Sequence, residues 1–244
     1  MNICVCIPAR YKSSRLQKKL LLPIKDKTII EHTYLQVIKS KYISEQDIFL
    51  ITDHKNIKNV MEKCMPKQNI IFEEKEYLNG TERIANNIHK INSKYNIIIN
   101  VQGDEPFINF KNIDFLIEKY LQYKNENIFL WTLKQHIEKN QLNNISFVKV
   151  ITDLENNVCD FTRKNDNLEG NNNVYISTGI YLFEKYNLLK YIELDDTSRQ
   201  KSESIEQLKV LEHNYKMKSF LCPFYNEISI NTKQDYEYLL KKYN

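Results

Sequence analysis

Residues 1–135 alternate between short apolar runs and segments with helical periodicity, and no other feature limits the fold as strongly. Such alternation predicts parallel strands joined by crossover helices that cover both faces of one sheet. The predicted strands are 2–8, 47–52, 69–73, 96–101 and 128–134, and the predicted helices are 28–41, 54–64, 81–93 and 110–123. We therefore expect an α/β fold with a mostly parallel sheet.

The second half of the chain changes character and is expected to add antiparallel strands. The predicted elements are strands at 146–152, 157–162 and 173–183, a polar loop at 164–173, helices at about 196–214 and 233–243, and a short strand near 217–222. With only 4 Gly and 5 Pro, the chain shows no obvious linker. We expect 1–244 to form a single domain, with 146–185 as a β-rich insertion that serves as a dimerisation arm in a homodimer.

Composition excludes several classes of protein. The 35 basic and 31 acidic residues give a net charge of +4, which is too balanced for a typical nucleic-acid-binding protein. No apolar stretch approaches the roughly 20 residues that cross a bilayer, and the start does not read as a secretory signal. The 5 cysteines are scattered and odd in number, so we expect reduced, mostly buried thiols in a cytoplasmic protein.

The segment 97–105, IINVQGDEP, is the strongest candidate for a binding site. Its apolar run reads as a buried strand that presents Gln102, Asp104 and Glu105 just past its carboxyl end. Ligands of open α/β sheets bind at that edge. Two carboxylates and an amide there suit a hydrated Mg²⁺ ion and a sugar-like partner.

A basic loop after the first strand complements these acids. Arg10, Ser13, Ser14, Arg15 and Lys19 follow a buried strand and precede a helix. Backbone N–H groups, serine hydroxyls and cationic side chains hold phosphate oxygens, although the segment matches neither GxxxxGK[ST] nor GxGxxG. A solvated basic loop is the alternative interpretation. Together with the acids, the loop suggests a site for a triphosphate and a metal ion.

Three weaker candidates have simpler explanations as well. Thr81 reads as a helix cap, which leaves Arg83 facing the predicted cleft. Asp53 is explained equally well as a helix cap and as a ligand. The spacing of Glu203, Glu206 and Gln207 places them on one helix face, where a solvated surface is the default. The 5 histidines stand apart, so neither a zinc site nor a Ser/His relay is supported.

Several motifs, in order and over nearly the whole chain, resemble the CMP-Kdo synthetase family, the 3-deoxy-manno-octulosonate cytidylyltransferases. These motifs are IPARYKSSRLQKKLL, TDH, GTERIA, NVQGDEPFI, FVKVITD, STGIYLF and ESIEQLKVLE. The resemblance implies a Rossmann-like sheet with a dimerisation arm. It also implies that CTP phosphates are held by Arg10, Ser14, Arg15 and Lys19, that Mg²⁺ is bound by Asp104, that Arg83 and Gln102 line the nucleotide and sugar-acid site, and that Glu203, Glu206 and Gln207 lie near the sugar.

Departures from the family pattern fall mainly on the sugar side. Gln17 and Lys18 replace the Pro-Gly that usually precedes the phosphate-binding lysine. Ser177 stands where the family has a sugar-side histidine, and it is kept as a candidate substrate-binding residue. Asn231 stands where the family has a second metal-binding aspartate; its amide oxygen can bind Mg²⁺ but lacks the charge that favours it.

The resulting hypothesis is cytidylyl transfer from CTP to Kdo or a related 2-keto sugar acid, with release of pyrophosphate and with Mg²⁺ as cofactor. Arg10, Lys19 and Asp104 are the expected catalytic residues, and Asp104 and Asn231 the expected metal ligands. The product would serve the synthesis of lipopolysaccharide, capsule or another surface polysaccharide. Two alternatives stay open: an acceptor such as a phosphorylated sugar, which would give a CDP-linked product, and a degenerate homologue that binds nucleotide without turnover.

Overall fold

The computed structural model describes residues 2–165, 168, 170–227 and 229–243. Its strands are β1 (Ile3–Ala9), β2 (Pro23–Ile24), β3 (Lys27–Thr28), β4 (Ile48–Thr52), β5 (Ile70–Phe72), β6 (Ile97–Val101), β7 (Leu130–His136), β8 (Lys149–Thr152), β9 (Val158–Thr162), β10 (Val174–Glu184) and β11 (Met217–Leu221). Its α-helices are α1 (Ile29–Val37), α2 (Lys55–Met61), α3 (Gly80–Asn87), α4 (Phe110–Tyr123), α5 (Lys185–Glu193), α6 (Ser198–Glu203), α7 (Gln207–Glu212) and α8 (Lys233–Tyr243).

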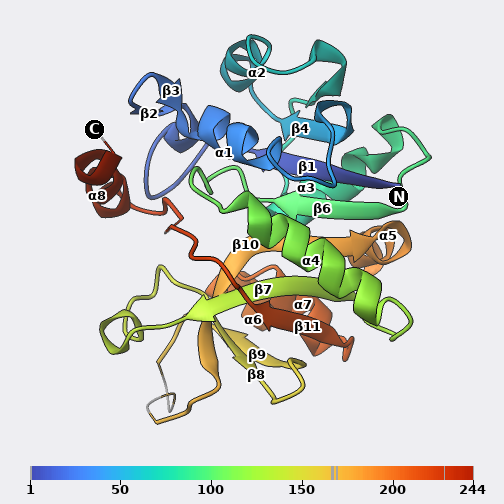
Figure 1. The fold of residues 1–244 in the computed structure, drawn as a ribbon, viewed down its shortest axis with the longest axis vertical. Coiled ribbons are helices and arrows are strands. Elements are labelled where there is room, and N and C mark those ends of the chain that lie inside the picture. Colours follow the sequence, from blue (N-terminus) through green and yellow to red (C-terminus); the bar gives the residue numbers. More distant parts are fainter. Residues whose placement is uncertain (1, 166–167, 169, 228, 244) are drawn as a thin grey trace.

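The central sheet is mostly parallel, as predicted, and has the strand order β11-β7-β10-β6-β1-β4-β5 (Figure 1). β1 pairs in parallel with β4 and with β6, and β4 pairs in parallel with β5. β10 is the exception, because it runs antiparallel to both β6 and β7. β7 therefore runs in the same direction as β6, although β10 lies between the two strands.

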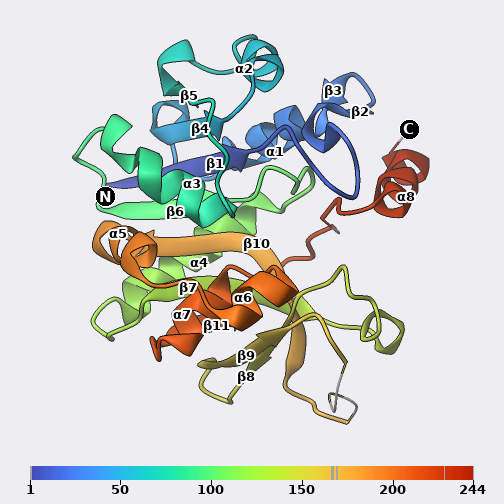
Figure 2. The same cartoon turned by 180° about the vertical axis from the view of Figure 1, so that it is seen from behind.

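Helices cover both faces of the sheet. α1 and α4 lie on the face seen in Figure 1, and α3, α5, α6 and α7 lie on the face seen in Figure 2. The alternation of β1 explains this, since Ile3, Val5 and Ile7 join the core on the first face while Cys4 and Cys6 join the core on the second. All cysteines are free, and Cys159 is the exposed one. Of the described helices, none combines the length and apolar character that a membrane crossing requires.

Two predictions for the second half of the chain were wrong. Helix α5 was missed, although its buried Leu188 and Tyr191 have helical spacing. The single helix expected at 196–214 is interrupted at Ser204, which adopts a left-handed conformation with φ 52° and ends α6. Tertiary contacts on both sides of this residue, described below, account for the break. The polar loop expected at 164–173 lies partly outside the described residues, which omit 166, 167 and 169.

The antiparallel strands of the β-rich insertion were predicted correctly. β8 and β9 form a hairpin, and β8 also pairs with Val174–Ile176 at the start of β10. The hairpin packs against the end of its own sheet, since the N–H of Ser219 on β11 donates to the carbonyl of Asn156 at 2.9 Å. That 146–185 forms a dimerisation arm stays a prediction.

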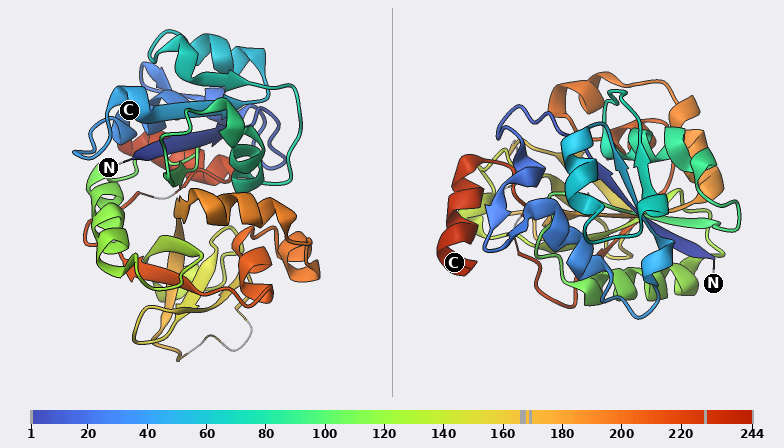
Figure 3. Two further views of the ribbon diagram at one scale, coloured as in Figure 1. Left: turned by 90° about the vertical axis from the view of Figure 1, so that its right-hand side faces the viewer. Right: turned by 90° about the horizontal axis from the view of Figure 1, so that it is seen from above.

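The C-terminal helix returns to the beginning of the chain. Figure 3 shows α8, in red, beside the blue segment that holds β2 and β3. The hydroxyl of Tyr236 donates to the carbonyl of Pro23 at 2.6 Å, and the ring of Tyr243 stacks on Phe107 at 4.0 Å. The segment between β11 and α8 therefore runs past the carboxyl ends of the central strands.

A buried lysine ties the hairpin to β7. Lys134 is 3% exposed, and its ammonium group donates to Thr152 Oγ1 at 2.5 Å and to Asn156 Oδ1 at 3.1 Å. Burial lowers the pKa of Lys134 from 10.5 to about 8. Between these two pH values the unfolded chain binds a proton that the folded protein has released, so stability rises with pH across that window.

We expect the Lys134→Met variant to lose this rise. The wild-type free energy of unfolding should increase by roughly 1 to 3 kcal/mol from pH 8 to pH 10, and that of the variant should stay nearly flat. Urea denaturation at the two pH values measures the difference. The exposed Lys55→Met variant is the control and should follow the wild-type profile. If Lys134→Met keeps the full increase in the free energy of unfolding from pH 8 to pH 10, the increase does not come from the lowered pKa of Lys134.

Candidate active site

One cleft of about 690 Å³ lies at the edge where the central parallel strands end. Every residue that the sequence assigned to the site lines it: Arg10, Ser14, Arg15, Lys19, Arg83, Gln102, Asp104, Ser177, Glu203, Glu206, Gln207 and Asn231. The topology explains their convergence, because the parallel strands β1 and β6 end at one edge, where Val101 lies opposite Ile180 of β10, and residues of the segment after β11 line the same cleft. The predicted site residues thus lie together in one cleft.

The basic loop after β1 is joined to the end of β6 by an ion pair. The ammonium group of Lys19 donates to Asp104 Oδ2, and Lys19 is 8% exposed. Arg10, Ser14 and Arg15 are exposed on the same loop, where they can meet a ligand that arrives from solvent. Lys18, just before the ion pair, has a left-handed backbone with φ 51°, a conformation that glycine adopts more easily.

A second ion pair fixes Arg83. Its Nη2 atom lies 2.8 Å from Asp53 Oδ2, and the two side chains are 4% and 14% exposed. Asp53 Oδ1 also accepts the N–H of Tyr11 at 2.9 Å, so the carboxylate connects α3 to the basic loop. Arg83 Nη1 is buried and has no hydrogen-bond partner among the described residues. The unpaired donor belongs to a side chain that lines the cleft.

Both helix caps predicted near these residues were wrong. The cap of α2 is His54, whose Nδ1 accepts the N–H of Asn56 at 3.1 Å, and not Asp53. The cap of α3 is Asn79, whose Oδ1 accepts the N–H of Glu82 at 2.8 Å, and not Thr81. Asp53 and Thr81 instead form long-range hydrogen bonds, Asp53 with Arg83 and Thr81 with Glu206. A cap read from the sequence cannot anticipate such partners.

Glu206 links the two halves of the chain at the bottom of the cleft. It accepts the backbone N–H of Thr81 at 3.0 Å, and Gln102 Nε2 lies 3.4 Å from its other oxygen. Gln207 Nε2 lies 3.4 Å from that second oxygen as well. Burial raises the pKa of Glu206. A fixed acceptor among amides suits recognition of a polyhydroxylated ligand.

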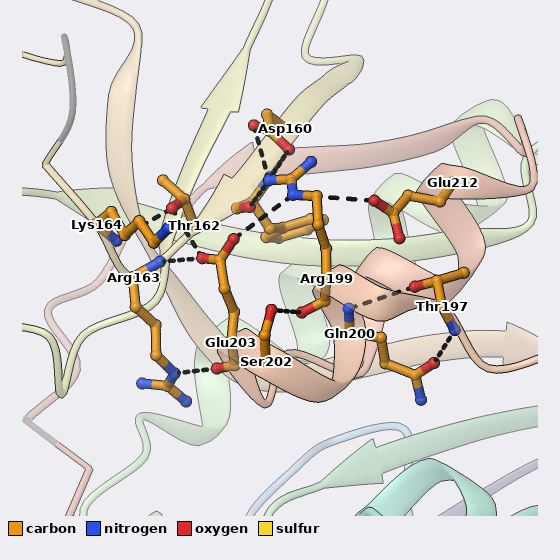
Figure 4. Close-up of polar contacts among 11 residues, drawn as sticks. Asp160, Thr162, Arg163, Lys164, Thr197, Arg199, Gln200, Ser202, Glu203 and Glu212 are labelled. Carbon is orange, nitrogen blue, oxygen red and sulfur yellow. Dashed lines mark hydrogen bonds and ion pairs between the residues drawn. The ribbon is translucent and has the colours of Figure 1, made fainter.

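Glu203 supports the cleft wall through contacts with Thr162 and Arg163 (Figure 4), and it does not share a helix with Glu206. Its Oε2 accepts the hydroxyl of Thr162 and the N–H of Arg163, both at 2.8 Å. Burial would raise the pKa of Glu203, but the N–H of Arg163 and the Thr162 hydroxyl lower it overall. The predicted common helix face was wrong, because the chain turns at Ser204 between the two glutamates.

Arg163 lines the cleft and Arg199 contacts the cleft residue Glu203, and neither arginine was assigned to the site from the sequence. Arg163 Nε donates to the carbonyl of Glu203 at 2.8 Å, and its Nη1 donates to the carbonyls of Ile145 and Ser146 at 3.0 Å. Arg199 Nη2 lies 3.1 Å from Asp160, and its Nε lies 3.5 Å from Glu203 (Figure 4). Two signals were present in the sequence: the i, i+4 spacing of Arg199 and Glu203, and the segment 161–163, which stands where the resembled family has FSR.

The adjacent carboxylates of Asp104 and Glu105 have different environments. Asp104 faces the cleft and Lys19, whereas Glu105 is 6% exposed and accepts the hydroxyl of Ser229. Burial and the neighbouring Asp104 carboxylate raise the pKa of Glu105 to about 8. A Cβ atom at Gly179 would overlap the Glu105 side chain, so glycine at 179 leaves room for the buried carboxylate in its present position.

The residues fit a magnesium ion at Asp104 only in part. One oxygen of Asp104 is paired with Lys19, and the other is available as a hard oxygen ligand. Among the described residues, no group of three His, Cys, Asp or Glu side chains could hold a metal by itself. Mg²⁺ commonly takes one or two carboxylates and completes its shell with water and substrate phosphates. The site therefore suits a metal that phosphate oxygens also bind.

Ser177 occupies the irregular part of β10, where its pairing with β7 shifts register before Tyr181. Its N–H donates to the carbonyl of Val148 at 2.8 Å. Its hydroxyl is buried and has no hydrogen-bond partner among the described residues. The residue lines the cleft as predicted, and its hydroxyl makes no contact that would reveal a role.

We expect Gly179→Ala to destabilise the protein by about 1 to 3 kcal/mol, because the added methyl group collides with Glu105. Urea denaturation measures this cost. In a Glu105→Ala background the methyl group meets no carboxylate, so the same substitution should cost less than it does in the wild type. Equal costs in the two backgrounds would show that the glycine is not required by Glu105.

Comparison with known proteins gives consistent matches. The model of a family described as Cytidylyltransferase matches residues 4–220. A 3-deoxy-manno-octulosonate cytidylyltransferase of Thermodesulfovibrio yellowstonii is 36% identical over 253 residues, which cover 97% of this chain and 96% of the relative. The same-named protein of Fusobacterium nucleatum is 34% identical over 248 residues, which cover 98% and 96%.

Among solved structures, a CMP:2-keto-3-deoxy-manno-octonic acid synthetase complexed with CTP matches with a TM-score of 0.86. It is 25% identical in sequence, and the match covers 99% of this chain and 98% of that one. The fold similarity therefore extends over the whole length of both proteins.

Proposed function

The chain belongs to the cytidylyltransferase family and is a nucleotidyltransferase, and we propose that it transfers the cytidylyl group of CTP to 3-deoxy-manno-octulosonate or a close 2-keto sugar acid. Pyrophosphate is the second product. The observation that carries the proposal is the convergence in one cleft of a cationic loop, the Asp104 carboxylate and a separate polar end built around Glu206.

The basic loop is proposed to bind the triphosphate. Arg10 and Arg15 would hold phosphate oxygens in pairs, and Lys19 would add a point charge beside Asp104. The ion pair fixes the ammonium group, so no reorganisation is needed as negative charge develops on the leaving pyrophosphate. Mg²⁺ is the proposed cofactor; held by Asp104 and the phosphate oxygens, it would withdraw charge from the reacting phosphoryl group.

The acceptor is proposed to bind toward Gln102, Glu206 and Gln207. These side chains hold one another in place, so their remaining polar atoms have fixed directions toward a ligand. The anomeric hydroxyl of the acceptor loses its proton to solvent as its oxygen forms a bond to the α-phosphorus, and the bond from that phosphorus to the oxygen that bridges it to the β-phosphate breaks, which releases pyrophosphate. Positioning and charge stabilisation, without a covalent enzyme intermediate, suffice for such a displacement.

The product of this reaction is a CMP-linked sugar acid, and we propose lipopolysaccharide or another surface polysaccharide as its destination. The relatives support this proposal through the acceptor in their name. The capsule, the cytoplasmic location and the homodimer remain predictions from the sequence.

The experiment that tests the proposal follows pyrophosphate release with CTP, Mg²⁺ and a panel of acceptors. We expect turnover with 3-deoxy-manno-octulosonate and none above background with sugar phosphates. Turnover only with a phosphorylated acceptor would replace the proposed acceptor with one that gives a CDP-linked product. Nucleotide binding without turnover on any acceptor would indicate a non-catalytic homologue.

Asp104→Ala should lower the rate of pyrophosphate release by about 10³-fold or more, because it removes the carboxylate that orients both Lys19 and the metal-bound triphosphate. The matched control is Asp195→Ala, which removes an exposed carboxylate outside the cleft and should leave the rate unchanged. A near-normal initial rate for Asp104→Ala would exclude the proposed role of this residue.

A further inference from the structure

The side chain of Asn231 already has a partner in the cleft. Its Oδ1 atom accepts a hydrogen bond from Arg15 Nη2 at 3.1 Å. The backbone holds this amide in place, because the N–H of Ile230 donates to the carbonyl of Asp104 at 3.2 Å. The N–H groups of Asn231 and Thr232 both donate to Asp235 Oδ2, at 2.9 Å and 2.7 Å. Asn231 is thus fixed between the basic loop and the end of β6.

An amide in this position differs from a carboxylate as a metal ligand. Asn231 has one oxygen and no charge, and that oxygen already faces the guanidinium group of Arg15. A divalent cation on the same oxygen would lie close to the arginine charge with no anion on the side chain to offset the repulsion. Asp104 is different, since its carboxylate keeps a second oxygen and a negative charge while it pairs with Lys19.

The charges around the site point the same way. Lys19 and Arg15 together carry two positive charges beside the carboxylate of Asp104, and Arg10 lines the same cleft. The Asp235 carboxylate accepts the N–H groups of Asn231 and Thr232, and Glu227 is paired with Lys242. The nearby Glu105 is buried against Ser229 and does not add an open carboxylate. Before nucleotide binds, this end of the cleft attracts an anion and repels a bare divalent cation.

We propose that Asn231 is a positioning residue for Arg15 and not a metal ligand, so that the protein takes up its divalent cation only together with the triphosphate. The proposal rests on the proposed function for the identity of the nucleotide. It replaces the expectation, drawn from the sequence, that Asp104 and Asn231 share the metal.

Binding of Mn²⁺, followed by the electron paramagnetic resonance signal of the free ion, tests the proposal without turnover. Wild-type protein should not bind Mn²⁺ in the absence of nucleotide, and CTP should create one tight site. Asn231→Asp should gain Mn²⁺ binding in the absence of nucleotide, since it places a second carboxylate near Asp104. Asn125→Asp, an exposed control that adds the same charge outside the cleft, should gain none.

Binding of CTP in excess EDTA separates positioning from metal ligation. Asn231→Leu should weaken metal-free CTP binding by about 5-fold, because Arg15 loses the acceptor that directs it. Arg15→Gln should weaken it by about 10-fold or more, and adding Asn231→Leu to Arg15→Gln should cause little further loss. Additive losses, or an unchanged affinity of Asn231→Leu, would overturn the positioning role.

The two proposals fail in different ways. Tight Mn²⁺ binding to the nucleotide-free wild type that Asn231→Leu abolishes would refute the assignment of Asn231 and leave cytidylyl transfer intact. Absence of CTP binding with and without Mn²⁺ would instead refute the proposed function, and with it the joint uptake of nucleotide and cation. Both proposals are supported if turnover depends on the metal and the nucleotide-free wild type binds no Mn²⁺.

Discussion

The antiparallel pairing of β10 with both β6 and β7 is the constraint on which the site depends. It places Ile180 opposite Val101 and thereby brings Ser177–Gly179 beside the loop that carries Asp104. Gly179 leaves room there for the side chain of Glu105, with which a larger residue would collide. Without this pairing, the first half of the sheet would hold the phosphate-binding groups, and the groups of the second half would lie elsewhere.

The central sheet and the residues that line the cleft could be predicted from the sequence because both follow from local patterns. Apolar runs and helical spacing located β1, β4, β6 and α4, and residues just past those strands had to meet at one edge. Side-chain roles within the cleft depended on partners far along the chain. Asp53 pairs with Arg83, and Thr81 donates its N–H to Glu206, so both local cap predictions failed.

The break at Ser204 has the same origin. A continuous helix satisfies the spacing of 196–214, but the contacts around residues 203–206 favour a turn. Arg163 holds the carbonyl of Glu203, while Glu206 reaches the N–H of Thr81. These long-range hydrogen bonds outweigh the local preference for helix, and no pattern within the segment encodes them. The roles of the adjacent Asp104 and Glu105 were likewise separable only through burial.

The way in which Arg163 joins two walls of the cleft bears on how the site can evolve. Its guanidinium group binds main-chain carbonyls of Ile145, Ser146 and Glu203, and every residue type supplies such a carbonyl. A substitution at Ile145 or Ser146 therefore leaves these contacts in place, whereas Glu203 also uses its side chain, which accepts the hydroxyl of Thr162 and the N–H of Arg163. Side-chain changes at 145 and 146 can thus alter this wall of the cleft without disturbing the main-chain contacts that hold it.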